Sequence, residues 1–178
     1  MRVIAGTYRS RVLKSVPGLT VRPTPDRLRE TLFNILAPRI EGSTFVDAFA
    51  GTGAVGIEAL SRGARRVVFL ERDLEVLACL RENLSSLKIG PEAHVVRGSA
   101  LRVLKDYPGD LIFLDPPYQR PSDYAVCLDA LSGPPEALVI AQHDAKFDPG
   151  EVVGRLERSR RVKQGSNVLS FYTFARPE

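Results

Sequence analysis

From about residue 43 onward, short apolar runs alternate with segments in which apolar residues recur every three or four positions. The runs are typical of buried strands, and the recurring positions are typical of one face of a helix. Strands are predicted at 44–49, 66–71, 93–97, 110–114 and 137–141, within 153–162, and at 168–174. Helices are predicted after 56 through 61, at 73–87, at 100–105 and at 122–131. This alternation with short loops indicates an α/β fold with a doubly wound, mostly parallel sheet.

The two ends of the chain depart from this alternation. Only four residues separate the last two predicted strands, so these strands form a hairpin and one of them runs antiparallel. At the other end, a short hairpin turning near Gly6 is expected, followed by a helix with Thr24 as N-cap and Pro25 at its first position. Residues 1–42 are therefore expected to form a basic extension, and residues 43–178 the main domain of one compact unit.

The charge of the chain is concentrated near its N-terminus. Overall, 25 Lys and Arg stand against 21 Asp and Glu, but residues 1–29 hold seven basic side chains against Asp26 alone. The rest of the chain has 18 basic and 20 acidic side chains. A second basic group lies near the C-terminus and consists of Arg155, Arg158, Arg160, Arg161 and Lys163. A basic segment joined to a weakly acidic body favours an anionic partner.

Several classes of protein are excluded by the composition. The longest apolar run, at 137–141, is far shorter than the roughly 18–20 residues that cross a bilayer, so no membrane span is expected. The first residues lack the apolar core of a signal peptide, so a cytoplasmic protein is expected. The cysteines and histidines do not stand at metal-ligand spacings, so no metal site is expected. Cys79 and Cys127 are interpreted as reduced, partly buried core residues.

A glycine-rich loop follows the first predicted strand. Gly51, Gly53 and Gly56 have the spacing G-x-G-x-x-G, and Glu71 ends the next strand 20 residues after Gly51. Glycines let the backbone approach a ligand closely, and the Glu71 carboxylate can accept hydrogen bonds from both hydroxyls of a ribose. The pattern predicts a nucleoside cofactor and leaves a nicotinamide dinucleotide and S-adenosylmethionine both open. Asp47 favours the second, because a carboxylate attracts its amino group and sulfonium but repels a pyrophosphate.

The segment Asp115–Tyr118, Asp-Pro-Pro-Tyr, stands at the carboxyl end of the fourth predicted strand. Ligands of open α/β sheets bind at this edge. The prolines stiffen a loop that presents a carboxylate, backbone carbonyls and an aromatic ring. An exocyclic amine on a nucleobase needs such a site, because acceptors for its N–H groups direct its lone pair and a stacked ring holds the flipped base. The segment therefore predicts a binding site for a base amine.

On these and further segments, the chain resembles the RsmD family of small-subunit ribosomal RNA guanine-N2 methyltransferases. The matching segments are Arg2–Gly6, Arg22–Thr24, Arg29–Leu36, Asp47–Gly53, Gly56–Ala64, Phe113–Tyr118 and Val168–Tyr172. The resemblance covers nearly the whole chain and implies a seven-stranded Rossmann-like methyltransferase domain that binds S-adenosylmethionine. It implies methyl transfer to the exocyclic N2 amine of a guanine in 16S rRNA, in an assembled or assembling small ribosomal subunit. A monomer that needs no metal is expected.

The resemblance also implies roles for individual residues. The cofactor would be held by Asp47, Phe49, Ala50, Gly51, Thr52, Gly53, Glu71, Arg72, Ser99 and Ala100. The catalytic segment that holds the target guanine would be Asp115, Pro116, Pro117 and Tyr118. The rRNA would be bound by Arg2, Arg9, Arg11, Lys14, Arg22 and Arg27. Two positions depart from the family, because Ser99 stands where an Asp often contacts the adenine amine and Gln142 stands where a Glu is common.

Other functions remain open from the residues alone. The Asp-Pro-Pro-Tyr segment also marks adenine-N6 methyltransferases, so an enzyme acting on adenine in DNA or another RNA is the nearest alternative. An acceptor-only carboxylate suits guanine, which presents N1–H and N2–H side by side, better than adenine, whose N1 is an acceptor. A nicotinamide-dependent oxidoreductase fits the glycines and Glu71 but leaves Asp47 and Asp115 unexplained. A non-catalytic RNA-binding factor would not need the complete set of motifs.

Overall fold

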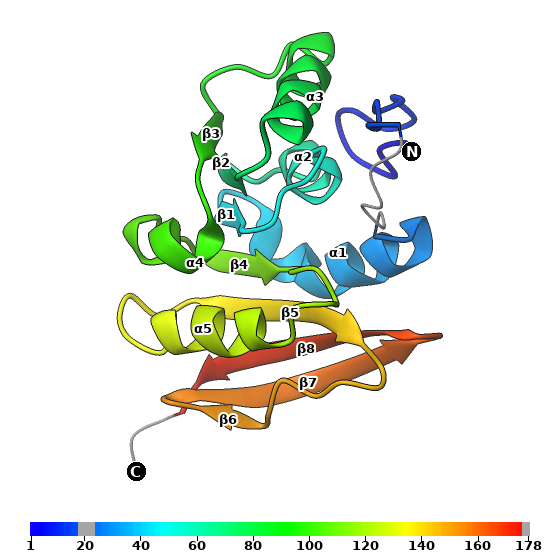
Figure 1. Ribbon diagram of the computed structural model, residues 1–178. Helices are drawn as coiled ribbons and strands as arrows, with labels where there is room; N and C mark the ends of the chain where they lie inside the picture. The colour runs from blue at the N-terminus through cyan, green and yellow to red at the C-terminus, as the bar shows by residue number, and fades with distance from the viewer. Residues whose placement is uncertain (18–23, 176–178) are drawn as a thin grey trace.

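The computed structural model describes residues 1–17 and 24–175. Within these residues, eight strands form one sheet in the order β3-β2-β1-β4-β5-β8-β7-β6 (Figure 1). The strands are β1 (Thr44–Asp47), β2 (Arg66–Glu71), β3 (Ala93–Arg97), β4 (Leu111–Leu114), β5 (Leu138–Asp144), β6 (Val152–Val153), β7 (Leu156–Gln164) and β8 (Asn167–Phe174). β1 to β5 are parallel to one another.

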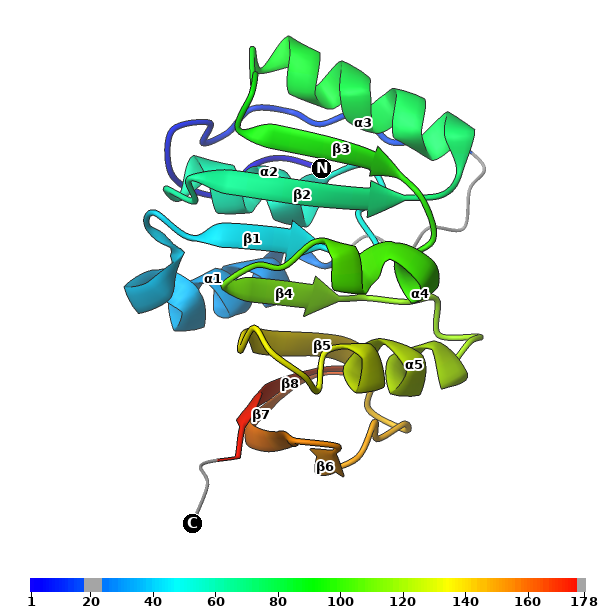
Figure 2. The ribbon, with the colours of Figure 1, turned by 90° about the vertical axis from the view of Figure 1, so that its left-hand side faces the viewer.

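Helices cover both faces of this sheet (Figure 2). The helices that share one apolar core are α1 (Asp26–Ile40), α2 (Ala54–Ser61) and α3 (Leu74–Ser86). On the opposite face lie α4 (Ala100–Val103), the 3₁₀ helix η1 (Leu104–Asp106) and α5 (Ser122–Ala130). Because both faces are covered, β4 is buried along its whole length, which explains its uninterrupted apolar sequence. The predicted doubly wound α/β fold is confirmed.

The C-terminal hairpin adds antiparallel strands to the sheet, as predicted. β8 runs antiparallel to both β5 and β7, and the two-residue β6 pairs with β7 as an eighth strand beyond the seven expected. The first residue of β8, Asn167, pairs with Asp144 at the end of β5. The turn between β7 and β8 therefore lies at the carboxyl edge of the parallel strands (Figure 1).

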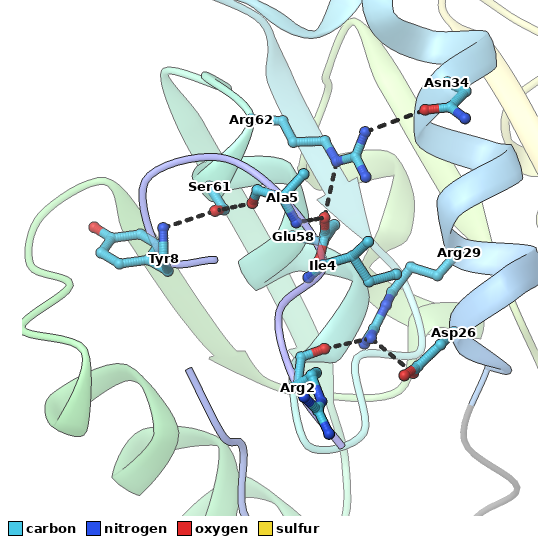
Figure 3. A network of polar contacts seen from close by, with 10 residues as sticks. All are labelled: Arg2, Ile4, Ala5, Tyr8, Asp26, Arg29, Asn34, Glu58, Ser61 and Arg62. Carbon is cyan, nitrogen blue, oxygen red and sulfur yellow. Dashed lines mark hydrogen bonds and ion pairs between the residues drawn. The ribbon is translucent and has the colours of Figure 1, made fainter. Parts of the chain in front are cut away.

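Residues 1–29 are here called the leader, and its first residues contact α2. A single bridge joins Arg2 and Val12, so the expected hairpin forms as a looped turn without two full strands. The backbone N–H groups of Ile4 and Ala5 donate instead to the Glu58 carboxylate, at 2.8 and 3.0 Å (Figure 3). Because a buried side chain of α2 accepts these hydrogen bonds, the backbone here does not need to pair with a second strand.

Arg29, a residue of α1, holds the start of the leader from inside the protein. Its side chain is fully buried, and Nη2 donates to the Arg2 carbonyl at 2.6 Å and to Asp26 Oδ1 at 3.0 Å (Figure 3). Burial lowers the pKa of Arg29, and the Glu58 and Asp26 carboxylates oppose that effect. One of the seven basic residues of the leader is therefore an internal anchor and not part of a charged surface.

The start of α1 differs from the prediction. The helix begins at Asp26, Pro25 occupies the N-cap position, and no side-chain cap bond is present there. The predictions of Thr24 as N-cap and of Pro25 as the first helical residue are therefore wrong. The Thr24 side chain is buried, and its Oγ1 lies 3.4 Å from Oδ2 of Asp115. A hydroxyl in this position is directed to a distant carboxylate and not to the first turn of its own helix.

No helix in the described ranges is long and apolar enough to cross a membrane. Within the same ranges, no group of His, Cys, Asp and Glu side chains could hold a metal ion. Cys79 is partly buried and Cys127 is buried, and both are free thiols.

Candidate active site

Asp47 and Asp115 stand at the carboxyl ends of two neighbouring strands. The chain proceeds from β1 to β2 and β3 and then returns to place β4 on the other side of β1. The strand order reverses between β1 and β4, which is where ligands of open α/β sheets bind. Asp47 is the last residue of β1, Asp115 directly follows β4, and both line one cavity of about 310 Å³. Two carboxylates from separate motifs therefore border the same space.

The glycine loop is held in place by Glu71. Its Oε2 accepts a hydrogen bond from the Gly51 N–H at 3.0 Å, and its Oε1 accepts from the N–H groups of Arg72 and Asp73 at 2.8 and 2.9 Å. Gly53 has a φ of +90°, and a Cβ there would lie 2.3 Å from a leucine side chain of α3. These contacts explain why the loop needs glycine, and why it lies against the end of β2.

Asp47 is a buried carboxylate with a raised pKa. It is 1% exposed, and its Oδ2 accepts a hydrogen bond from the Gly56 N–H at 3.0 Å. Burial raises the pKa of Asp47 to about 7, the Gly56 hydrogen bond opposes this rise, and the charge of Glu71 adds to it. A cation in the cavity would favour the ionised carboxylate, so the site suits a ligand that carries an ammonium group. A pyrophosphate would meet carboxylates instead, which argues against a nicotinamide dinucleotide.

A second cavity of about 220 Å³ adjoins the first. The two cavities share the lining residues Phe49, Gly51, Val76 and Asp115. The second cavity is also lined by Glu71, Arg72, Ser99 and Ala100, which were predicted to bind the ribose and adenine. Ala50 and Thr52 line the first cavity, whereas Gly53 is buried and lines neither. An elongated nucleoside ligand with a cationic end fits this arrangement of donors, acceptors and space.

The two prolines of the Asp115–Tyr118 segment lead from β4 to the cavity edge. Pro116 is buried, and Pro117 is exposed and lines the second cavity. Proline fixes its own φ, and the Pro117 carbonyl accepts a hydrogen bond from the Arg120 N–H at 2.8 Å, so this loop has few conformations. The loop thus places a carboxylate and a half-exposed tyrosine at one edge of the sheet.

Two residues from distant parts of the chain hold this loop, and sequence reasoning assigned neither to the site. Thr24, ahead of α1, contacts the Asp115 carboxylate. Asn167, at the start of β8, accepts a hydrogen bond from the Tyr118 hydroxyl at 3.0 Å. The only sequence signal for Asn167 was the predicted C-terminal hairpin, whose turn had to lie at one edge of the sheet.

Buried polar residues support the end of β5 behind this loop. The Tyr124 hydroxyl donates to the Gln142 carbonyl at 2.6 Å, and His143 Nε2 lies 2.9 Å from Ser170 Oγ. Burial lowers the pKa of His143, so this residue is a neutral member of the core. Gln142 Oε1 is buried and has no hydrogen-bond partner in the described part of the chain. Neither Gln142 nor His143 lines the two cavities, so both belong to the support of the site.

Three of the predicted RNA-binding residues gather at one hollow of the leader. Arg2, Arg9 and Arg27 line a shallow depression of about 340 Å³, together with Asp26 and Glu30. Asp26 is already paired with the buried Arg29. The hollow shares no lining residue with the cavity of the two carboxylates. The chain connects them at two points, because Met1, which directly precedes Arg2, and Thr24, two residues before Asp26, both line that cavity.

Other basic residues are engaged within the protein. Arg11 donates to the Ser86 carbonyl at 3.1 Å, and Lys14 forms an ion pair with Glu82 at 2.8 Å, so both lie against α3. Arg22 falls outside the described residues.

The C-terminal basic group is also divided by its contacts. Arg155 lies over the Phe174 ring at 5.3 Å, and Arg158 pairs with Asp148 at 2.6 Å. The remaining members of the group, Arg160, Arg161 and Lys163, are exposed on β7.

Comparison with known proteins agrees with this geometry. The family model described as Conserved hypothetical protein 95 matches residues 1–173. A candidate rRNA methyltransferase of Bacillus subtilis, YlbH, is 36% identical over 180 residues, which cover 97% of this chain and 98% of the relative. The ribosomal RNA small subunit methyltransferase D of Haemophilus influenzae is 46% identical over 123 residues, or 66% of this chain and 64% of that relative. A solved structure from Escherichia coli, described as the candidate methyltransferase yhhF, superposes with a TM-score of 0.83 at 37% identity and covers 98% of this chain and 97% of its own.

Proposed function

The chain belongs to the family described as Conserved hypothetical protein 95, the RsmD family of S-adenosylmethionine-dependent methyltransferases, and we propose that it methylates the exocyclic N2 amine of a guanine in 16S rRNA. The observation that carries this proposal is the cavity that Asp47 and Asp115 line together. One carboxylate suits a cationic cofactor, and the other suits the N–H donors of a base. The methyl donor and its acceptor would thus meet between β1 and β4.

The residues around the two cavities fit the cofactor. Asp47 binds the ammonium group of the methionine part, and the loop 49–53 lies along it. Glu71 accepts hydrogen bonds from the ribose hydroxyls, while Arg72, Ser99 and Ala100 border the adenine. When bound, S-adenosylmethionine supplies an electrophilic methyl group on a positively charged sulfur. Binding of the ammonium favours the ionised form of Asp47, which compensates for its burial.

The Asp115–Tyr118 segment holds the target base. Asp115 accepts hydrogen bonds from guanine N1–H and N2–H, and the backbone carbonyl of Pro116 offers a second acceptor for the amine. A base amine is a weak nucleophile because its lone pair is delocalised into the ring, and fixed acceptors direct that lone pair toward the methyl group. Tyr118 stacks on the flipped base. Positioning supplies most of the rate enhancement, and Asp115 need not remove the proton before the methyl group is transferred.

The basic hollow of Arg2, Arg9 and Arg27 binds phosphates on either side of the target nucleotide. It lies next to the carboxylate cavity along the chain, at Met1 and at Thr24, so a base flipped toward Asp115 leaves its flanking phosphates near these arginines. The rRNA is bound in an assembled or assembling small ribosomal subunit, by a monomer in the cytoplasm.

The test is methyl transfer from labelled S-adenosylmethionine to 16S rRNA, followed by mass analysis of the nucleosides. The substrate is naked 16S rRNA or small subunits from cells that lack this protein. N2-methylguanosine at a single position is the expected product, and Asp115→Asn serves as the inactive control. N6-methyladenosine as the product would instead establish the adenine alternative. Absence of methyl transfer to either form of the substrate would contradict the proposal.

A further inference from the structure

We propose that Asn167 is a positioning residue for the methyl-transfer site, and that it acts by fixing the ring of Tyr118. The inference rests on the proposed function, in which this ring stacks on the target base. The carrying observation is the hydrogen bond from the Tyr118 hydroxyl to Asn167 Oδ1, at 3.0 Å and across 49 residues of sequence. No motif in the sequence connects these two residues.

Asn167 is well placed to act as a rigid anchor. It is 6% exposed, and its backbone is the first residue of β8, paired with Asp144 of β5 on one side and with Gln164 of β7 on the other. A residue held between two strands has little freedom, so its side chain can transmit a fixed position. The strand arrangement brings it to the carboxyl edge of the sheet, where Tyr118 lies.

The Tyr118 ring benefits from such an anchor. It follows two prolines, and the Pro117 carbonyl accepts a hydrogen bond from the Arg120 N–H at 2.8 Å, so this turn fixes the backbone on either side of Tyr118 but not the orientation of its ring. The tyrosine is half exposed, so packing surrounds only part of its ring. Because the hydroxyl is the far end of the ring, a hydrogen bond there restricts the plane in which a base can stack.

The experiment is a double-mutant cycle on kcat/KM for methyl transfer to 16S rRNA. Asn167→Ala and Tyr118→Phe each remove the same hydrogen bond, and Tyr118→Phe keeps the aromatic ring. We expect each to lower kcat/KM by about two- to tenfold, the range of one neutral hydrogen bond. The double variant should be no worse than Tyr118→Phe alone, and the affinity for S-adenosylmethionine should not change. Multiplied losses in the double variant would overturn the inference.

Two further variants separate positioning from a general effect on stability. Asn167→Asp keeps an acceptor oxygen for the tyrosine hydroxyl and should recover most of the lost kcat/KM, whereas a loss equal to that of Asn167→Ala would contradict the assignment. Gln164→Ala removes another amide of the same hairpin, one that donates to Thr31 on α1 at 3.4 Å. It should leave kcat/KM unchanged, and a loss as large as that of Asn167→Ala would assign the effect to the hairpin as a whole.

A measurement without substrate keeps this inference separate from the proposed function. In protein labelled with ¹³C-tyrosine, the Tyr118 ring signal is identified by its disappearance in Tyr118→Phe. Asn167→Ala should shift or broaden this signal, and Gln164→Ala should not. An unchanged signal in Asn167→Ala would overturn the inference even if methyl transfer to guanine were established. A shifted signal would support the anchor even if another base proved to be the substrate.

Discussion

The two halves of the active site are built in different ways. On the cofactor side, Asp47, Glu71 and the glycine loop belong to one β-α-β unit, and the carboxylates bind backbone N–H groups of that same unit. On the target side, Asp115 and Tyr118 contact side chains that are 91 and 49 residues away in sequence. The hydrogen bonds that hold the cofactor-side carboxylates are therefore local, whereas those of the target side form only once the leader and the C-terminal hairpin are in place. Substitutions in the two halves should therefore affect different measurements.

The largest effect is expected on the target side. Asp115→Ala removes the acceptor for the base N–H groups and should lower the rate of methyl transfer by at least about 100-fold. The affinity for S-adenosylmethionine should remain near that of the wild type, because the ammonium is bound by Asp47. Single-turnover transfer and titration calorimetry measure the two quantities. Loss of cofactor binding in a folded variant would break the division between the halves.

On the cofactor side, Asp47→Asn should weaken the binding of S-adenosylmethionine by about 10- to 100-fold, because a charge-assisted contact is lost. The ligand-free protein should become more stable at pH 8, since burial of the ionised carboxylate no longer opposes folding. Calorimetry and thermal unfolding at pH 8 test both results. A variant that binds the cofactor as well as the wild type would show that the ammonium is held elsewhere.

The pH dependence of the cofactor side follows from the same carboxylate. Burial raises its pKa from the ordinary 3.8 to about 7 in the folded protein, so its contribution to stability is complete below about pH 3.8 and is lost as the pH rises to about 7. The affinity for S-adenosylmethionine should change in the opposite direction and fall by up to tenfold for each pH unit below about 7. Asp47→Asn should remove this dependence. Calorimetry between pH 5.5 and pH 8, in about half-unit steps, measures it.

The smallest effect separates the two groups of leader residues. The double substitution Arg9→Gln and Arg27→Gln should weaken rRNA binding by about two- to tenfold at moderate salt and lower the slope of log affinity against log salt by about two. The double substitution Arg11→Gln and Lys14→Gln removes the same charge from residues that contact α3, and it should change both quantities less. Equal effects of the two pairs would indicate a general electrostatic attraction and not a defined hollow.

The elements of the α/β core were predictable because they depend on local patterns. β4 is a short apolar run that is buried on both faces, and α3 repeats its apolar positions at helical spacing behind the Asp73 cap. The glycine loop with Glu71, and the Asp-Pro-Pro-Tyr segment, could be assigned to a ligand edge for the same reason. In a doubly wound sheet, a residue that directly follows a parallel strand lies at the carboxyl edge of the sheet, where ligands bind.

The remaining features depend on tertiary contacts that have no period in the sequence. The sequence does not distinguish the basic residues of the leader from one another. In the fold, Arg29 is buried, Arg11 and Lys14 contact α3, and Arg2, Arg9 and Arg27 line one hollow. Thr24 is of a residue type that often caps helices, but its side chain contacts Asp115 instead.

The sequence by itself determined the order of strands and helices, the cofactor loop and the segment that holds the base, because backbone geometry and hydrophobic periodicity act over a few residues. Only the tertiary structure decided which side chains position that segment. The bond between Tyr118 and Asn167 depends on an antiparallel strand returning to the carboxyl edge of the sheet, and this placement follows from packing the whole chain.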